Sequence, residues 1–316
     1  MFTTSTLQPS GTRHRLAFTA AGAAALAAAF LTAPAADADV VPPPCAALAV
    51  APPIPLPTTT SPAAAILRRL AGHLSTVPAD FLTGRYTKLS LRMSGAGSSI
   101  GDCVETETYA AAETRWRDED TNSGRITGIP WHPATQVAPP PVTTWYRPGE
   151  LPGVISGRVP TDPVRLAAAL DTAYPPDTLA APAPGHTPEV LAAGRLTPSG
   201  TERRVEAVAD LVTWHDTPPA ARRAILLVLA AVPGLLSHGH VIVNGRSAIA
   251  VSIAGTTNTQ VLLIDAASGE ILEAEQVLTD PTIGHNLAVG VPYSLSRDLI
   301  TGRGRTNRPA ADATGA

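Results

Sequence analysis

The sequence predicts an α+β fold in which a curved antiparallel β-sheet, a meander of hairpins, packs against a few helices. Residues 241–253, VIVNGRSAIAVSI, are typical of two strands joined by an Asn-Gly turn. The nearby run LLIDAASGEIL is typical of a second hairpin. The stretch before them, Ile225 to Val232, is apolar almost all round, as expected of a helix packed against a sheet.

Composition limits the functions that this chain can have. Its 316 residues suffice for a sizeable core. The formal net charge of −3 gives no electrostatic reason to expect nucleic acid as a partner. Aromatic residues make up 4% of the chain, so Ala, Val and Leu must supply most of the packing.

The amino terminus, residues 1–38, has the order of a secretory signal peptide. Arg13 and Arg15 precede an uncharged run from Leu16 to Ala36, and small residues continue to Ala38. We predict export with cleavage after Ala38, so the protein is expected to be secreted or otherwise extracytoplasmic. The alternative is a single-pass membrane anchor, because the uncharged run is long enough to span a bilayer.

Two cysteines, Cys45 and Cys103, follow the expected cleavage site. An exported protein enters a compartment that permits disulfides, so these residues form a possible disulfide, with two unpaired thiols as the equal alternative. Cys45 lies in residues 39–60, which are rich in Pro and Thr and lack a helical period. We interpret residues 39–60 as an extended Pro-rich linker.

A single α+β domain is expected over residues 61–285. Ser61 is suited to cap a first helix with Pro62 at its first position. Arg85 to Met93 alternates as a strand that ends in a glycine turn, and Cys103 to Trp116 continues as the next strand or strands.

The next segments are expected to be less regular. Residues 124–160 are dense in Pro and Gly, and only Thr143 to Tyr146 looks extended, so we expect an irregular insertion. Asp162 before Pro163 is typical of a helix start, and further helices are expected after Ser199 and Thr217. Residues 286–316 are expected to form a tail that is largely disordered after 301.

The helix-hairpin-hairpin run from PPAARRAILLVLAAVPG to LLIDAASGEILEAEQVL resembles the carboxy-terminal half of an uncharacterised extracytoplasmic family of high-GC Gram-positive bacteria. The residues that carry the resemblance are Val232 to Leu235, the Gly245-Arg246 pair and Asp265 to Gly269. Ala248 stands where the family usually has glycine. The family's pattern is also matched further upstream, at Tyr86, Glu113 to Trp116 and Val159 to Pro163. The likeness therefore covers roughly residues 63–280.

The resemblance implies a fold and a location, but no chemistry. Many members of this family carry a domain similar to anti-sigma regulators before a membrane segment. About a dozen residues precede the apolar run here, so direct contact with a sigma factor is not expected. A helix followed by antiparallel strands is also similar to the lipid-carrying half-barrels of bacterial envelopes.

Several residues are candidates for functional sites. His238 and His240 would share one strand face, which suits a metal, but an edge strand gives the same spacing. The His215-Asp216 pair is interpreted as a capping or surface feature. Asp118 to Asp120 is interpreted as a solvated turn in preference to a calcium loop. The residues that follow Gly95 have the pattern of a strand, whereas a dinucleotide-binding loop is followed by a helix, so such a loop is not expected here.

The four tryptophans are interpreted as core or lid packing in preference to a ligand cage: Trp116, Trp131, Trp145 and Trp214. No catalytic motif, cofactor site or metal site is assigned. We therefore expect a non-enzymatic binding module with an unknown envelope component as its partner. The first alternative is a carrier of an apolar or lipid-like small molecule, and the second is a hydrolase that would gather His215, Asp216 and a serine in a cleft.

Overall fold

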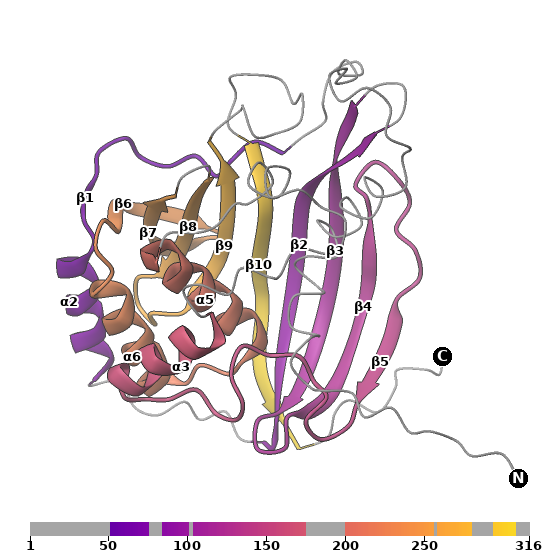
Figure 1. The fold of residues 1–316 in the computed structure, drawn as a ribbon, viewed down its shortest axis with the longest axis horizontal. Coiled ribbons are helices and arrows are strands. Elements are labelled where there is room, and N and C mark those ends of the chain that lie inside the picture. The colour runs from indigo at the N-terminus through magenta and orange to yellow at the C-terminus, as the bar shows by residue number, and fades with distance from the viewer. Residues whose placement is uncertain are drawn as a thin grey trace, which may run out of the picture. The chain divides into compact units, whose positions relative to one another are not determined.

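The computed structural model describes residues 51–75, 84–100, 104–174, 200–255, 258–279 and 293–307, which belong to one compact unit, Val41–Ala316. Ten strands form one antiparallel sheet, and the four helices in the described residues lie against one of its faces (Figure 1). The predicted α+β fold is confirmed. The expected cleavage site at Ala38 and both cysteines of the possible disulfide, Cys45 and Cys103, lie outside the described residues.

The strands follow the order β1-β6-β7-β8-β9-β10-β2-β3-β4-β5 across the sheet. Their bounds are β1 Ser61–Pro62, β2 Tyr86–Ile100, β3 Val104–Asp118, β4 Ser123–Pro133, β5 Val142–Tyr146, β6 Leu236–Val243, β7 Arg246–Ala254, β8 Asn258–Asp265, β9 Ile271–Leu278 and β10 Tyr293–Thr306. The helices are α2 Ala64–Leu74, α3 Pro163–Ala173, α5 Gly200–Trp214 and α6 Pro219–Ala230. In the described part of the chain, no helix combines the length and apolar character that crossing a membrane requires.

The helices bury apolar faces against β6–β10. Leu67, Leu70 and Leu74 of α2 recur at helical spacing and are buried, as are eight of the twelve residues of α6. Asp162 caps α3 as predicted, because its side chain accepts a hydrogen bond from the backbone N–H of Arg165. The expected cap at Ser61 is wrong: Ser61–Pro62 pairs with β6 as β1, and α2 begins at Ala64.

Both predicted hairpins are present. Asn244 (φ 50°) and Gly245 (φ 77°) join β6 to β7, and Gly269 (φ 65°) helps to join β8 to β9. Ile249 and Val251 enter the core beneath the helices, whereas Ala248 and Ala250 are buried with valine and leucine side chains in a second cluster on the opposite face. This half of the sheet is therefore covered on both faces.

The cover on the second face comes from residues 51–57. Ile54 and Leu56 pack on the second cluster, and the backbone N–H of Ile54 donates to Glu275 Oε2 at 3.0 Å. The ring Nδ1 of His238 lies 2.9 Å from the carbonyl oxygen of Pro57. The interpretation of residues 39–60 as a free linker is thus wrong for this part, which packs on the sheet.

The carboxy-terminal prediction is also wrong. Residues 293–306, expected to lie in a tail that is largely disordered after 301, form β10, which pairs with β9 on one side and β2 on the other. β10 therefore joins the two predicted hairpins to β2–β5, and the domain extends beyond the expected boundary at 285.

Two further expectations in the first half of the domain are corrected. Gly95 and Gly97, expected in a turn, lie inside β2, which continues to Ile100. The expected irregular insertion at 124–160 contains β4 as well as the predicted β5. Gly124 and Gly128 lie in β4 because a side chain there would collide with β3. A Cβ at Gly124 would lie 1.9 Å from the carbonyl oxygen of Trp116.

Candidate binding site

Strands β2–β5 form the half of the sheet farthest from α2 and α6 (Figure 1). β5 is the edge strand here. Four of the seven large apolar residues that are exposed in the described chain fall between positions 131 and 145: Trp131, Val137, Val142 and Trp145. Trp145 and Val142 alternate along β5 and so point to opposite faces of the sheet. Because an exposed indole is typical of interaction surfaces, this half of the sheet is the first candidate for a binding site.

Side-chain alternation assigns residues 86–96 of β2 to one face or the other. Leu89, Leu91 and Met93 belong to the core beneath the helices. Lys88, Ser90 and Arg92 therefore point to the opposite face of the sheet, which we call the outward face. The register extends this assignment to the strands paired with β2, and two rows of side chains cross the strands on this face.

The first row, which we call the cation–aromatic row, consists of four residues in register: Lys88, Trp116, Arg125 and Trp145. The Arg125 guanidinium lies between two indoles, with Cζ 4.1 Å from the ring centroid of Trp116 and 5.1 Å from that of Trp145. Lys88 Nζ lies 5.9 Å from the Trp116 ring. Trp116 and Arg125 are buried, whereas Trp145 is 61% exposed. The stack holds an exposed indole in a fixed position on a strand.

The second row lies two residues further along each strand and carries hydroxyl groups. We call it the hydroxyl row, and its members are Ser90, Thr114, Thr127 and Thr143. Ser90 Oγ lies 3.3 Å from Thr114 Oγ1, and Thr127 Oγ1 lies 3.0 Å from Thr143 Oγ1. The outward face thus offers stacked aromatic and cationic groups beside a line of hydrogen-bonding hydroxyls.

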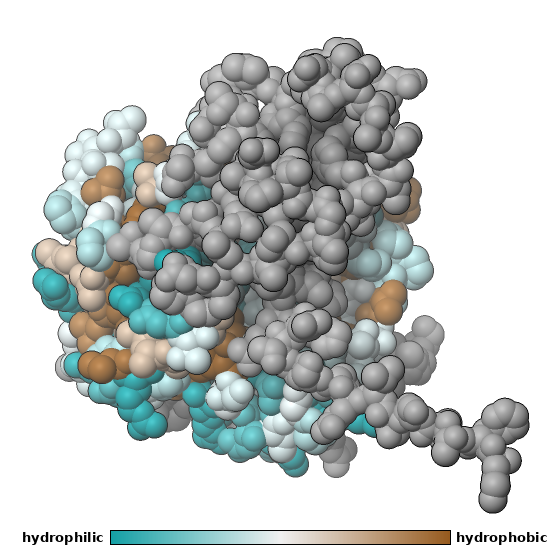
Figure 2. All heavy atoms as spheres, in the orientation of Figure 1, coloured by the Kyte–Doolittle hydropathy of each residue, from teal (hydrophilic) through white to brown (hydrophobic). Residues whose placement is uncertain are grey.

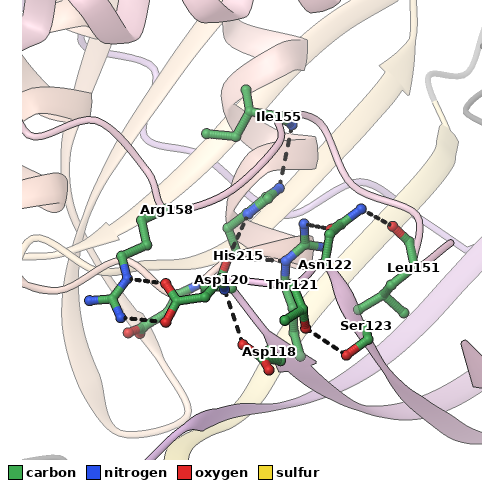
Figure 3. A network of polar contacts seen from close by, with 12 residues as sticks. Asp118, Asp120, Thr121, Asn122, Ser123, Leu151, Ile155, Arg158 and His215 are labelled. Carbon is green, nitrogen blue, oxygen red and sulfur yellow. Dashed lines mark hydrogen bonds and ion pairs between the residues drawn. The ribbon is translucent and has the colours of Figure 1, made fainter. Parts of the chain in front are cut away.

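A buried polar network lies at the end of β3 and sets the position of the β3–β4 hairpin. Arg117 Nε donates to Glu119 Oε2 at 3.0 Å, and the same oxygen lies 3.1 Å from Nδ1 of His215, which is fully buried. Arg117 also donates to the carbonyl oxygen of Pro152 at 2.9 Å and to the Asn122 side chain. The network joins β3, the loop after β5 and the end of α5 (Figure 3).

The electrostatics of the network keep Glu119 charged. Burial alone would raise its pKa, but the hydrogen bond and charge of His215 and the charge of Arg117 outweigh burial and lower the pKa. Asp118, beside it, forms an ion pair with Arg85 at 2.7 Å. Among the residues coloured in Figure 2, those at the lower edge of the view are mostly hydrophilic.

These contacts correct two interpretations made from the sequence. Asp118 and Glu119 do not form a solvated turn, since both are buried. Asp120 is exposed as expected and pairs with Arg158 at 2.9 Å (Figure 3). His215 is not a surface residue, because its ring lies within the network and Nε2 is 3.5 Å from the backbone nitrogen of Ile155.

The hydrolase alternative would require His215 and Asp216 to act together, and their contacts do not bring them together in this manner. His215 faces Glu119, whereas the Asp216 carboxylate binds Arg305 of β10. The backbone N–H of Asp216 donates to Glu119 Oε1 at 3.0 Å. Both residues therefore tie α5 to the sheet.

The two histidines of β6 are separated by a bulge at Gly239 (φ 81°). His238 Nε2 lies 2.7 Å from Ser252 Oγ, and His240 Nδ1 lies 3.2 Å from Ser247 Oγ. Within the described residues, no three His, Cys, Asp or Glu side chains are placed to hold a metal ion.

A second group of ionisable residues lies on the face of the sheet that the helices cover. Arg115 stacks on Trp214, with Cζ 3.6 Å from the ring centroid, and donates to the carbonyl oxygen of Thr213 at 2.7 Å. Burial, with the charge of Asp210, raises the pKa of Asp298 to about 7 although Arg115 opposes this. Burial and the charges of Asp210 and Glu202 likewise raise the pKa of Glu206 to about 7.

The prediction that the tryptophans serve core or lid packing is confirmed for two of the four. Trp116 is buried and Trp214 packs against the core, as expected, whereas Trp131 and Trp145 are exposed. The cation–aromatic row could not be predicted from the sequence, because its members come from four strands, one of which was expected to be irregular. The alternation of Lys88 with Leu89 was the one available signal for this face.

No family model matches this chain, and no curated protein matches its sequence. A chain of the Pseudomonas aeruginosa MucA/MucB complex is similar over 79% of this chain, with 12% identity and a TM-score of 0.26, and the match spans 59% of that chain. A DUF1329 family protein from Desulfovibrio piger is similar over 80% of this chain and 97% of its own length, with 12% identity and a TM-score of 0.21. Both TM-scores are low.

Proposed function

We propose that the protein is a non-enzymatic binding module that is exported and associates with the cell envelope, and that it binds through the outward face of β2–β5. The observation that carries the proposal is the stack of Arg125 between Trp116 and Trp145, which fixes a 61% exposed indole on a strand. A side chain that is already ordered loses little entropy on binding, and Trp and Arg contribute most to binding energies at interfaces.

Packing beneath the helices favours a surface module over a carrier of an apolar or lipid-like molecule. A carrier needs apolar walls around an open volume. Here the largest fully buried side chains fill the layer between helices and sheet: Leu67, Leu166, Leu170, Leu211, Ile225, Leu226, Leu229, Leu262 and Ile264. The non-enzymatic role is supported by the structural contacts of His215 and Asp216, and export is supported by the signal-like order of residues 1–38.

Sedimentation with isolated cell envelopes tests the proposal. The Trp145→Ala variant should reduce the envelope-bound fraction by about fivefold, the effect of losing about 1 kcal/mol of aromatic contact. Ile242→Ala is the matched control, since Ile242 is 73% exposed on β6, away from this face. Equal retention of the wild type and Trp145→Ala would contradict the proposal. Mass spectrometry of the purified protein would instead support the carrier if it found a stoichiometric lipid.

A further inference from the structure

We propose that β5 is a dimerisation edge, along which two copies of this chain pair their β5 strands antiparallel so that their sheets become continuous. The inference goes beyond the proposed function, because it concerns the backbone edge of the sheet and not its outward face. It rests on the difference between the two edges of the sheet, on the composition of β5 and on the register that self-pairing requires.

The two edges of the sheet are protected to different degrees. At one edge, β1 covers the start of β6, and β6 is interrupted by a bulge at Gly239. At the other edge, β5 pairs with β4 from Val142 to Tyr146 without any shift in register. A bulge and a covering segment are among the devices that keep an edge strand from pairing with another chain. Within the described residues, β5 has neither device.

The composition of β5 is typical of a strand that pairs on both sides. Its sequence, VTTWY, consists of β-branched and aromatic residues, without a charge or a proline. Val142 is 57% exposed and Trp145 is 61% exposed. In an antiparallel ladder only every second residue directs its N–H and C=O toward a given neighbour, so the remaining groups of β5 point away from β4. A second strand would bond these groups and cover apolar surface.

The ends of β5 limit the pairing to its five residues. Three prolines, Pro139 to Pro141, precede the strand and have no N–H to donate. After the strand, the backbone N–H of Arg147 already donates to Glu150 Oε2 at 2.8 Å. A partner strand of the same length and without charge therefore fits this edge, and β5 of a second copy is such a strand.

Self-pairing has one register that uses the whole strand. Paired residues of an antiparallel ladder both direct their hydrogen-bonding groups at the other strand, so in self-pairing their positions must differ by an even number. Thr144 then faces Thr144 of the second copy, Val142 faces Tyr146, and Thr143 faces Trp145. The last two pairs each combine a β-branched with an aromatic residue, which is a favourable cross-strand combination. No like charges meet across the two-fold axis.

The size of this contact predicts a reversible dimer. A pair of five-residue strands buries less than the roughly 1,200 Å² of a stable interface, so we expect a dissociation constant of about 10–100 µM. Paired residues point to the same face of a sheet, so the outward faces of both copies lie on one side. The dimer would therefore present the Trp145 indoles of both copies to the same surface, which strengthens binding through multivalency.

Sedimentation velocity of the full chain between about 1 and 500 µM tests the inference, since the wild type should shift from monomer to dimer over this range. Thr144→Lys and Thr144→Glu should each weaken dimerisation by about tenfold or more, because like charges then meet across the axis. An equimolar mixture of the two variants should dimerise within about threefold of the wild type, because opposite charges then meet. The control Ile242→Lys adds the same charge to β6, where Ile242 is 73% exposed, and should leave dimerisation unchanged.

Three results would overturn the inference. A wild type that stays monomeric throughout the range would exclude self-pairing and leave the edge to a strand of another protein. Dimerisation that is lost in Ile242→Lys, or kept by both Thr144 variants, would place the contact elsewhere. Thr144 variants that are monomeric alone and do not dimerise when mixed would contradict the register through Thr144. Thr144 is exposed, so circular dichroism should show both variants folded, and the wild-type series tests the dimer in either case.

Discussion

Glu119 Oε2 lies 3.1 Å from Nδ1 of His215, although the two residues are 96 positions apart in the sequence. The same oxygen accepts a hydrogen bond from Arg117 Nε at 3.0 Å. This carboxylate therefore holds the end of β3 against the end of α5. Because Trp116 precedes Arg117 on β3, the contact also fixes the strand that carries the centre of the cation–aromatic row.

Glu119→Gln should destabilise the protein by about 3 kcal/mol, since it removes the charge that compensates the buried Arg117. Urea denaturation at pH 7 measures the change in the free energy of unfolding. Asp120→Asn is the matched control in the same turn, because the Asp120–Arg158 pair is exposed and its loss should leave the urea midpoint unchanged. Similar midpoints for both variants would show that the buried network does not stabilise the fold.

Stability should fall as pH rises from about 5 to 8. The pKa values of Glu206 and Asp298 are raised to about 7 in the folded protein, whereas the ordinary values are 4.5 and 3.8. Between these limits the folded state binds more protons than the unfolded state, so the free energy of unfolding decreases with pH until both groups are ionised. Asp298→Asn should remove about 2–3 kcal/mol of this decrease.

Thermal unfolding at pH 5.5 and pH 8 measures this dependence. The wild type should melt at a lower temperature at pH 8, and Asp298→Asn should show a smaller difference between the two conditions. Glu150→Gln, at an exposed site, serves as the control and should retain the difference shown by the wild type. An unchanged difference in Asp298→Asn would mean that Asp298 is ionised well below pH 7 in the folded protein.

Elements specified by local signals were predictable from the sequence. The hairpin at Asn244 and Gly245 needs two residues that adopt positive φ, and the start of α3 needs a capping side chain, which Asp162 provides. β10 was not predictable in this way. Arg303 and Arg305 face the helices, where Arg303 donates to the carbonyl oxygen of Val212, and only these tertiary contacts show that a charged strand is part of the core layer.

The candidate site depends on register, which no local pattern specifies. Trp116 and Trp145 meet Arg125 because β3, β4 and β5 pair in one particular alignment. β4 was not predicted, because its glycines were interpreted as residues that interrupt regular structure. Gly124 lies in the strand for a different reason, namely that its backbone approaches Trp116 too closely for any side chain.

Gly124→Ala should therefore destabilise the protein by about 3 kcal/mol, since its Cβ would meet the Trp116 carbonyl oxygen at 1.9 Å and strands β3 and β4 would have to separate. Gly72→Ala is the opposite case. Among the described residues, no atom outside the helix's own backbone lies within 4 Å of its Cβ position on α2, so alanine should stabilise the protein by about 0.5–1 kcal/mol. Chemical denaturation measures both changes, and a neutral Gly124→Ala would contradict the close pairing of β3 with β4.

Truncation after Pro292 should abolish cooperative folding, because β9 and β2 both lose the hydrogen-bonded partner that β10 supplies. The same deletion removes Arg305, and so frees the Asp216 carboxylate that anchors the end of α5 to the sheet. Circular dichroism during heating measures the transition. A chain that ends after Arg308 keeps all of β10 and should retain the cooperative melting of the full chain. A cooperative transition in the shorter chain would show that β2–β5 and β6–β9 fold without the strand between them.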